Sequence, residues 1–594
     1  MELLINNPFS AMKIIAAEPG TWHFDHQLRS CGEKVWELEI TLKSENKSKL
    51  PPFQLSMLFP CRDMVCRWHA NSFFDKSLLP EWGAGFSGEL ACGAPVLGYV
   101  SQSGNNAMIC SVSDALRKTS FKSGIKEFTF ELNTEIRFLE VPEPPADFYS
   151  VVIRFDFRKI PFETAMKECA GWYAAMASYT PAPVPEGGFD AWYSTWYSYH
   201  KDLTAPEVLA ECRTAKELGM KGVIVDDGWQ CDTSEGIYHY CGDWQPAQSR
   251  FPGMKDFVSE VHEMGMKVLL WYSVPFVGFN SSNFSRFEGK YLRLLPIHGA
   301  GVLDPRFPEV RAFLTETYVN ALKEWNLDGF KLDFIDRFII PDGEEDPAEK
   351  ENYRNRDIKL LPAAVDALLT NIMASLREVK KDILVEFRQK YMGPAIRKYG
   401  NLLRATDCPG DITANRCRVA DLRLTSGETA VHGDMLRWHD SESTESAARQ
   451  ILATLFAVPQ ISVKLNEIPA EHLEMIRWRL EFYNRFKEPL VKCDLQSPHP
   501  EQNYPLLRAE GKNEAVSCLY SENLSLELAA LAKGKQEIIV NASASENCIV
   551  KLPIQAEAEI RSCTGTIQEK FLLRPGITEI KIPLSGECHL TPRR

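Results

Sequence analysis

Trp325-Asn-Leu-Asp-Gly-Phe-Lys-Leu-Asp333 is the stretch that decides the fold. A helix-length amphipathic segment, 308–325, leads into it, and its apolar run, 328–333, ends on a carboxylate. Strand-like and helix-like segments alternate in the same way on both sides, which is typical of a parallel β/α fold. Eight strands are expected, at 189–196, 221–226, 267–273, 328–333, 383–387, 401–406, 428–433 and 459–465. The sequence therefore predicts a central (β/α)8 TIM barrel.

Helices are expected between these strands. The amphipathic segments are 205–218, 254–264, 308–325, 360–379, 442–457 and 469–486. Pro308 suits the first position of a helix, and Gly219 and Gly265 suit left-handed C-terminal caps. The link after the sixth strand, 407–427, is the least helix-like, so we expect the barrel to be irregular there.

The barrel is flanked by β-rich segments. Short strand-like runs at 36–42, 127–132 and 149–155 predict an N-terminal β-sandwich, and a helix at 162–176 leads to a Pro- and Gly-rich boundary at 181–188. Strand-like runs return at 513–519 and 536–540, which predicts a small C-terminal β-sandwich. The fold class is thus multidomain α/β plus all-β, with domains at 1–180, 188–488 and 489–594.

Composition excludes several classes of function. The net charge of -13 argues against nucleic acid as a partner, because phosphate binding needs clustered Lys and Arg. No apolar stretch is long enough to span a membrane, and the N-terminus lacks the pattern of an export signal. We therefore expect a cytoplasmic protein with reduced thiols among its 16 cysteines. Assembly into a homo-oligomer stays open.

Polar side chains gather at the ends of the predicted strands, where TIM-barrel active sites lie. The carboxylates are Asp226, Asp227, Asp333, Asp336, Glu386, Asp407, Asp411 and Asp434. Paired carboxylates suit glycoside cleavage, in which one is the nucleophile and the other the acid and base. The same array could hold a divalent cation, but Lys331, Arg388 and Arg404 end the same strands and argue against a metal. No metal or other cofactor is expected.

Aromatic residues are also abundant at these strand ends. They include Trp192, Trp196, Tyr197, Trp229, Trp271, Tyr272 and Trp438. The apolar C–H faces of sugars pack on such rings, so a small carbohydrate is the expected partner. Trp271 is equally compatible with barrel packing. His432 could contact the substrate or be hydrogen-bonded in the core.

Three segments give the chain a specific resemblance. Val225-Asp-Asp-Gly-Trp229, Trp325-to-Asp333 and Arg404-Ala-Thr-Asp407 occur in the order seen in the α-galactosidase (melibiase) family, glycoside hydrolase family 36. The resemblance implies an N-terminal β-supersandwich, a central barrel and a C-terminal β-domain. It also implies a retaining, exo-acting α-glycosidase that forms a covalent glycosyl-aspartate intermediate.

The resemblance also implies roles for individual residues. Asp333 would be the nucleophile and Asp407 the general acid and base, with Asp411 as the rival for the second role. Asp226, Asp227 and Lys331 would bind hydroxyl groups of the sugar. Trp196 and Trp229 would wall the subsite.

One departure from the family concerns the fifth strand. The family has a Glu, Cys and paired-Gly pattern ending in Arg, whereas this chain has Glu386-Phe-Arg-Gln-Lys-Tyr-Met-Gly-Pro394. Arg388 and Gln389 would impose different hydrogen bonds on the substrate. Galactose is therefore the family default. An α-glucoside, an α-N-acetylgalactosaminide or an acidic sugar is an alternative, as are a raffinose-synthase-like transglycosylase and a noncatalytic sugar-binding barrel.

Overall fold

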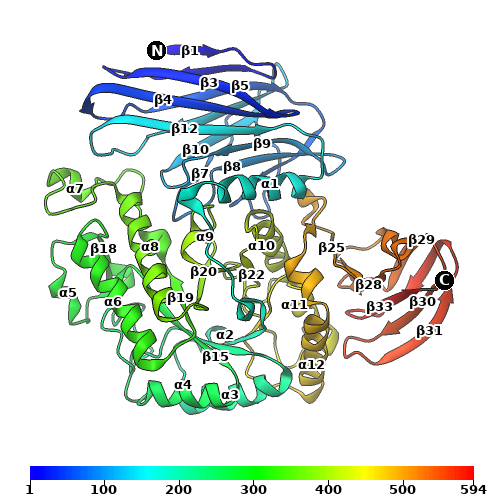
Figure 1. Ribbon diagram of the computed structural model, residues 1–594. Helices are drawn as coiled ribbons and strands as arrows, with labels where there is room; N and C mark the ends of the chain where they lie inside the picture. The colour runs from blue at the N-terminus through cyan, green and yellow to red at the C-terminus, as the bar shows by residue number, and fades with distance from the viewer. Residues whose placement is uncertain (594) are drawn as a thin grey trace.

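The computed structural model describes residues 1–593, with a barrel in the middle and β-sheets at either end of the chain (Figure 1). Eight parallel strands form the barrel in the order β22-β21-β20-β19-β15-β14-β13-β23. They are β13 (Trp192–Ser194), β14 (Gly222–Val225), β15 (Lys267–Ser273), β19 (Gly329–Asp333), β20 (Leu384–Arg388), β21 (Leu402–Arg404), β22 (Ala430–His432) and β23 (Gln460–Ile461). Single bridges from His432 to Val458 and from Leu436 to Ile461 bring the two edge strands together, so the barrel is nearly closed. The predicted barrel is confirmed.

Helices surround the barrel. They are α3 (Ala205–Leu218), α4 (Met254–Glu263), α6 (Pro308–Trp325), α8 (Leu361–Val379), α10 (Ile412–Thr425), α11 (Thr444–Ala453) and α12 (Ala470–Arg485). Pro308 is the first residue of α6, and Gly219 ends α3 in the left-handed conformation with φ 102°. A small sheet of β16 (Phe276–Gly278), β17 (Tyr291–Leu295) and β18 (Ala300–Leu303) is inserted between β15 and α6.

The segment 407–427 is more regular than predicted, because it contains the 14-residue helix α10. The sequence hides this helix because both apolar and polar side chains of α10 are buried, which removes the amphipathic pattern. Asn415 and Asp421 are among the buried polar residues, and each is hydrogen-bonded. The expectation of an irregular link was therefore wrong.

The N-terminal part contains two six-stranded antiparallel sheets, ordered β1-β2-β5-β11-β10-β7 and β3-β4-β12-β9-β8-β6. Their strands are β1 (Glu2–Ile5), β2 (Ala11–Ile15), β3 (His23–Gly32), β4 (Val35–Ser48), β5 (Phe53–Pro60), β6 (Met64–His69), β7 (Phe86–Gly88), β8 (Val96–Ser101), β9 (Asn106–Val112), β10 (Thr119–Ile125), β11 (Glu131–Phe138) and β12 (Ala146–Asp156). Alternate residues of β5 are buried, as a two-layer sandwich requires. The predicted strand at 127–132 is mostly a turn, in which Phe128 is 99% exposed, and β11 begins only at Glu131.

The C-terminal part pairs a seven-stranded sheet, ordered β24-β25-β26-β28-β33-β30-β31, with a three-stranded sheet, β27-β29-β32. The strands are β24 (Leu495–Gln496), β25 (Leu506–Glu510), β26 (Glu514–Leu519), β27 (Ser525–Glu527), β28 (Gln536–Asn541), β29 (Asn547–Leu552), β30 (Ala556–Arg561), β31 (Ile567–Leu573), β32 (Gly576–Lys581) and β33 (Glu587–Pro592). Most neighbours are antiparallel, although β26 runs parallel to β28 and β27 runs parallel to β29.

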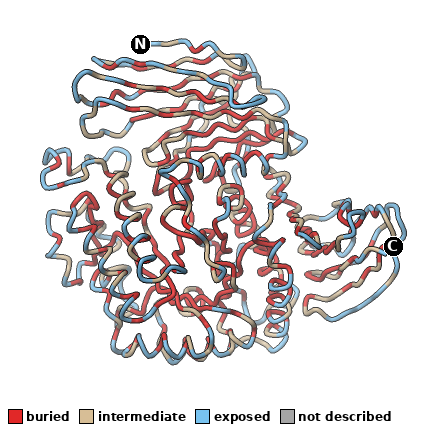
Figure 2. Tube along the Cα trace, in the orientation of Figure 1, coloured by how far each residue is buried: buried red, intermediate tan, exposed pale blue. Residues whose placement is uncertain are grey.

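Part of the N-terminal sandwich packs into the hydrophobic core of the barrel, while the interior of the sandwich forms a separate buried cluster. Trp68 of β6 and Phe162 of α1 (Phe162–Ala174) belong to the same buried cluster as the barrel strands. Figure 2 shows red, buried segments both in the barrel and in the sandwich strands next to it. The domain limits 1–180, 188–488 and 489–594 stay a prediction. Within residues 1–593, no helix is both long and apolar enough to cross a membrane.

Candidate active site

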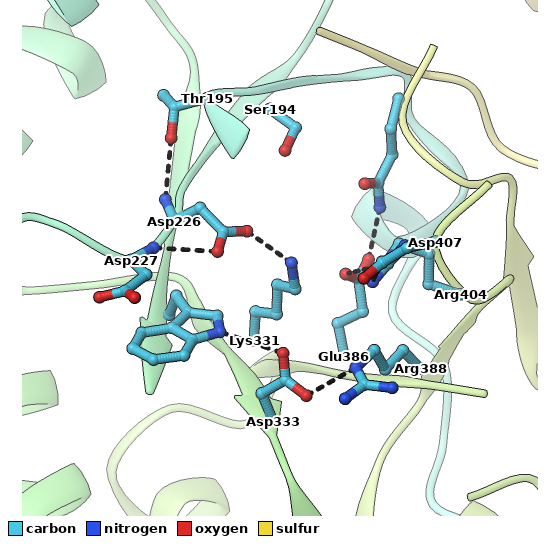
Figure 3. A network of polar contacts seen from close by, with 12 residues as sticks. Ser194, Thr195, Asp226, Asp227, Lys331, Asp333, Glu386, Arg388, Arg404 and Asp407 are labelled. Atoms are coloured by element: carbon cyan, nitrogen blue, oxygen red, sulfur yellow. Dashed lines mark hydrogen bonds and ion pairs between the residues drawn. The ribbon is translucent and has the colours of Figure 1, made fainter. Parts of the chain in front are cut away.

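The carboxyl ends of four barrel strands, β14, β19, β20 and β21, bring the predicted site residues together (Figure 3). Asp226 and Asp227 follow β14 directly, and Asp333 is the last residue of β19. Arg388 and Arg404 end β20 and β21, and Asp407 lies three residues beyond Arg404. Parallel strands end at one face of the barrel, which explains why residues far apart in sequence meet here.

Asp333 accepts hydrogen bonds on both carboxylate oxygens. Its Oδ1 accepts from Arg388 Nε at 2.7 Å, from Tyr391 Oη at 2.8 Å and from the backbone N–H of Phe334 at 2.7 Å. Its Oδ2 accepts from Trp271 Nε1 at 3.2 Å. Burial raises the pKa of Asp333, but Arg388, Lys331 and these donors outweigh burial and hold it well below its usual range. Asp333 is therefore ionised at neutral pH although it is only 7% exposed.

Lys331 points from β19 toward Asp226 and forms a buried ion pair with its Oδ2. Figure 3 shows the Lys331 amine with Asp226, Asp333 and Asp407 around it. The neighbouring Asp227 has its Oδ1 bonded to Gln230 Nε2 at 2.6 Å, while its Oδ2 lies 3.5 Å from Lys201 Nζ. Burial raises the pKa of Asp227 to about 6 because these partners compensate only in part.

Arg404 organises the other side of the site. Its Nη2 donates to Asp407 Oδ1 at 2.9 Å, its Nη1 donates to Asp434, and its Nε lies 3.7 Å from Glu386 Oε1. Asp434 also accepts from Tyr197 Oη at 2.9 Å. Arg404 is thus a buried cation that holds the more exposed Asp407.

Asp407 is the most accessible carboxylate of the site, with 49% of its side chain exposed. Burial raises the pKa of Asp407, but the charges of Arg404, Lys331 and Arg388 lower it by more. The net pKa therefore lies below the usual value. The charge of Asp333 acts in the opposite direction and raises it. The protonation of Asp407 is thus coupled to the charge on Asp333.

Asp411 has a different environment. It is the N-cap of α10, and its Oδ1 accepts from the backbone N–H of Ala414 at 2.8 Å. Asp411 thus satisfies a free backbone N–H at the start of the helix. Of the two aspartates, Asp407 is the one that pairs with a cation of the site, Arg404.

Three other predicted site residues lie in or near the core. Trp229 is 0% exposed, and its Nε1 donates to the backbone carbonyl of Trp271 at 2.9 Å, so its ring lies in the core and has no surface open to a ligand. His432 is also fully buried and contacts Gln460 Nε2 and the Gly188 carbonyl. Trp196 is half-buried at the start of α2 (Trp196–Tyr199), at the same end of the barrel as the site.

Sequence reasoning missed three residues at the site. Tyr391 contacts Asp333, Lys201 faces Asp227, and Tyr238 stacks on Trp271 with ring centroids 6.3 Å apart. All three come from loops, where apolar periodicity gives no signal. The unusual loop after Glu386 was the single available hint for Tyr391.

A cleft of about 680 Å³ opens at Pro409 and Gly410, which follow Asp407 closely in the chain. Residues from the loops after β13, β21, β22 and β23 line it, which places it at the same end of the barrel as the site. Its lining includes Pro409, Gly410, Arg437, Trp438, Arg449 and Lys464. Within residues 1–593, no group of three or more His, Cys, Asp or Glu side chains has the geometry of a metal site.

Comparison with known proteins identifies a family domain in the barrel. The family described as melibiase matches residues 189–371, which include Asp226, Asp227, Lys331 and Asp333. Alpha-galactosidase Mel36A of Lactobacillus acidophilus is 26% identical over 151 residues, which is 24% of this chain and 20% of that protein. An A type blood alpha-D-galactosamine galactosaminidase of Flavonifractor plautii is 25% identical over 174 residues, or 26% of this chain and 15% of that protein.

The matched stretch spans about a fifth of the length of the first of these relatives. Similarity in structure extends further. The crystal structure of an alpha-galactosidase from Lactobacillus brevis is similar over 100% of this chain and 85% of that chain, with a TM-score of 0.65 and 12% sequence identity. The whole arrangement of sheets and barrel is therefore shared with that fold.

Proposed function

We propose that this chain is a retaining, exo-acting α-glycosidase of the α-galactosidase (melibiase) family, glycoside hydrolase family 36, whose family model matches residues 189–371. The observation that carries this proposal is the pairing of a buried, ionised Asp333 with a half-exposed Asp407 on the same rim of the barrel. Such a pair supplies the nucleophile and the acid that glycoside cleavage needs.

In the first step, Asp333 attacks the anomeric carbon with one carboxylate oxygen. The bond from that carbon to the leaving oxygen breaks, and Asp407 gives its proton to the leaving oxygen. A β-linked glycosyl ester of Asp333 forms, and Asp407 is left as a carboxylate. Water then attacks the anomeric carbon while Asp407 takes a proton from it, and Asp333 leaves as a carboxylate. The sugar keeps its α configuration.

The charge of Asp333 acts in the direction that this change of role needs, while Arg404, Lys331 and Arg388 keep the net pKa of Asp407 below its usual value. The negative charge of Asp333 raises the pKa of Asp407 before the first step. Formation of the ester removes that charge, so the pKa of Asp407 falls when the residue must act as a base. Retention also requires the two carboxyl groups to lie roughly 5 to 5.5 Å apart.

The cleft of about 680 Å³ at Pro409 and Gly410 is the proposed site of the leaving group. The proton donor must lie on the leaving-group side of the sugar, and Pro409 and Gly410, which line this cleft, follow Asp407 closely in the chain. Arg437, Arg449 and Lys464 give it many hydrogen-bond donors. We therefore favour a carbohydrate as the leaving group over an apolar one.

Galactose is the first sugar to test. The curated relatives include proteins named alpha-galactosidase and one named galactosaminidase. The chain differs from the family at Arg388 and Tyr391, so an amino sugar, an α-glucoside or an acidic sugar belongs in the same test. A cytoplasmic location and a homo-oligomeric state stay predictions.

The test is a panel of p-nitrophenyl α-glycosides, with galactose, galactosamine, N-acetylgalactosamine, glucose and a uronic acid as the sugars. We expect release of nitrophenol from one member, with the α anomer of the sugar appearing first in the proton NMR spectrum. Asp333→Ala should lower that rate by roughly 10⁴-fold or more. Azide should restore part of the rate and yield the β-glycosyl azide.

The matched control is Asp494→Ala, which removes an aspartate that is 72% exposed on the surface. It should keep the full rate. Initial formation of the β anomer would contradict retention. Absence of release from every member, together with sugar transfer to an added acceptor, would favour the transglycosylase, and binding without either reaction would favour the noncatalytic barrel.

A further inference from the structure

The two oxygens of the Asp333 carboxylate are held unequally. Oδ1 accepts three hydrogen bonds, from Arg388, Tyr391 and the Phe334 backbone, whereas Oδ2 accepts one from Trp271. A carboxylate oxygen offers about two lone pairs. Those of Oδ1 are therefore fully used, and Oδ2 keeps one that is free to attack.

Tyr391 is well suited to fix this asymmetry. Its side chain is fully buried, and burial raises the pKa of its hydroxyl well above the usual value, so the hydroxyl stays protonated and donates. The Arg388 guanidinium lies over the Tyr391 ring, 5.5 Å from its centroid, and over the Phe334 ring at 5.3 Å. Each donor thus limits the movement of the other.

The loop that carries Tyr391 is supported by two other parts of the molecule. Gln389 Oε1 accepts from the backbone N–H of Thr406, the residue before Asp407, at 3.1 Å. The Lys390 carbonyl accepts from the backbone N–H of Gly93 in the N-terminal sandwich at 2.7 Å. Gly393 approaches the same place so closely that a Cβ would lie 2.9 Å from the Gly93 carbonyl oxygen.

We propose that Tyr391 is a positioning residue which, with Arg388, holds Oδ1 of Asp333 and presents Oδ2 to the anomeric carbon, and that the N-terminal sandwich supports this clamp through Gly93. The role of the clamp in the reaction rests on the proposed function. Its existence as a structural coupling between Tyr391 and Asp333 does not.

The clamp has a specific consequence for the second step. In the glycosyl ester, Oδ2 carries the sugar and Oδ1 is the ester carbonyl. When the ester breaks, the negative charge returns to the carboxylate, where Tyr391 and Arg388 stabilise it. Loss of Tyr391 raises the pKa of Asp333 and makes it a poorer leaving group, so breakdown of the intermediate slows more than its formation.

The kinetic test is Tyr391→Phe with a dinitrophenyl α-glycoside, whose leaving group needs no acid. We expect kcat to fall by roughly 10- to 100-fold and KM to fall with it, so that kcat/KM changes by less than about threefold. Rapid mixing should show a burst of dinitrophenol equal to the enzyme concentration. An unchanged kcat, or a loss of kcat with unchanged KM and no burst, would overturn the role.

The matched control is Tyr318→Phe, because Tyr318 is also a buried tyrosine of the barrel domain and its hydroxyl has no hydrogen-bond partner within residues 1–593. It should leave the kinetics unchanged.

The support from the N-terminal sandwich is tested with Gly393→Ala. Its Cβ must push the loop away from Gly93, and kcat should fall as it does in Tyr391→Phe. The two changes act on one contact, so the double variant should be no slower than the slower single variant. Additive effects would overturn the coupling. Gly171→Ala, where a Cβ meets nothing within 4 Å, is the control for the substitution itself.

A measurement of stability decides the clamp even if no glycoside is cleaved. Tyr391→Phe should lower Tm in the wild-type background, because Asp333 loses a donor. In an Asp333→Ala background the Tyr391 hydroxyl has no carboxylate to which it can donate, so the same change should not lower Tm. Equal losses of Tm in both backgrounds would show that Tyr391 does not act on Asp333. Failure of the glycosidase proposal alone would leave this coupling intact.

Discussion

Asp226 and Asp227 are neighbours at the end of β14, yet their carboxylates are compensated to different extents. Asp226 pairs with Lys331 and accepts the backbone N–H of Asp227 at 2.9 Å. The Nζ of Lys201 lies 3.5 Å from Oδ2 of Asp227, and this oxygen has no hydrogen-bond partner within residues 1–593. An incompletely paired, buried carboxylate destabilises the empty protein and is ready to receive hydroxyl groups of a ligand.

Asp227→Asn should therefore stabilise the protein at high pH. The folded pKa of about 6 lies above the unfolded value of about 4, so the buried group lowers stability as pH rises through this window. Below about pH 4 both states hold the proton and the variant should match the wild type. At pH 8 we expect the variant to be more stable by about 2 to 3 kcal/mol and to have lost its activity. Thermal unfolding between about pH 3.5 and pH 8 measures this.

Asp226→Asn is the matched control for that experiment. It leaves the buried Lys331 without its carboxylate, so Tm should fall at pH 8. Equal behaviour of the two variants would show that Asp227 is as well compensated as Asp226, contrary to the structure.

Sequence reasoning located the strand-end residues because their positions follow from the fold alone. Asp333, Lys331, Arg388 and Arg404 all lie on or at the ends of runs of apolar residues, and parallel strands must deliver such residues to one face. Tyr391, Lys201 and Tyr238 could not be found in this way. Their place depends on how loops fold back over the barrel, which the local sequence does not specify.

At the scale of elements, α10 shows where periodicity fails. Six helices were predicted at their observed places because each has one buried face, and eight strands because they are short apolar runs that are buried on both faces. α10 is covered by the neighbouring domains as well as by the barrel, so its buried residues include Asn415, Arg416 and Asp421. Contacts between distant segments satisfy these polar groups, and a pattern of apolar residues cannot reveal them.

The start of α10 also separates the two aspartates that compete for the role of acid. Asp411→Ala removes the helix cap and should cost about 1 kcal/mol of stability with little change in kcat. Asp407→Ala should keep the stability and lower kcat/KM by roughly 10²- to 10⁴-fold for a natural substrate. The loss should be much smaller for a dinitrophenyl glycoside, because its leaving group needs no proton. If Asp411→Ala lowered kcat/KM in this way and Asp407→Ala changed only the stability, Asp411 would be the acid.

At the scale of the whole molecule, Asp421 joins three parts of the chain. Its carboxylate accepts from Trp68 Nε1 of β6 at 2.8 Å and from Tyr504 Oη, which precedes β25, and it pairs with Lys76 Nζ at 3.1 Å. All four side chains are almost completely buried. The N-terminal sandwich, the barrel helix α10 and the C-terminal sheet thus share one charged contact.

Loss of this contact should uncouple the domains. Asp421→Asn leaves the Lys76 ammonium buried without a counter-charge, which costs roughly 3 to 5 kcal/mol. Scanning calorimetry of the variant should show a lower Tm and a separate unfolding transition for the N-terminal sandwich. We expect the wild type to unfold in a single transition. Lys76→Met with Asp421→Leu removes both charges and should recover much of the loss, because a buried ion pair adds little beyond an apolar replacement. If Asp421→Asn melts in one transition at the wild-type temperature, the hydrophobic packing between sandwich and barrel, and not this ion pair, is what couples them.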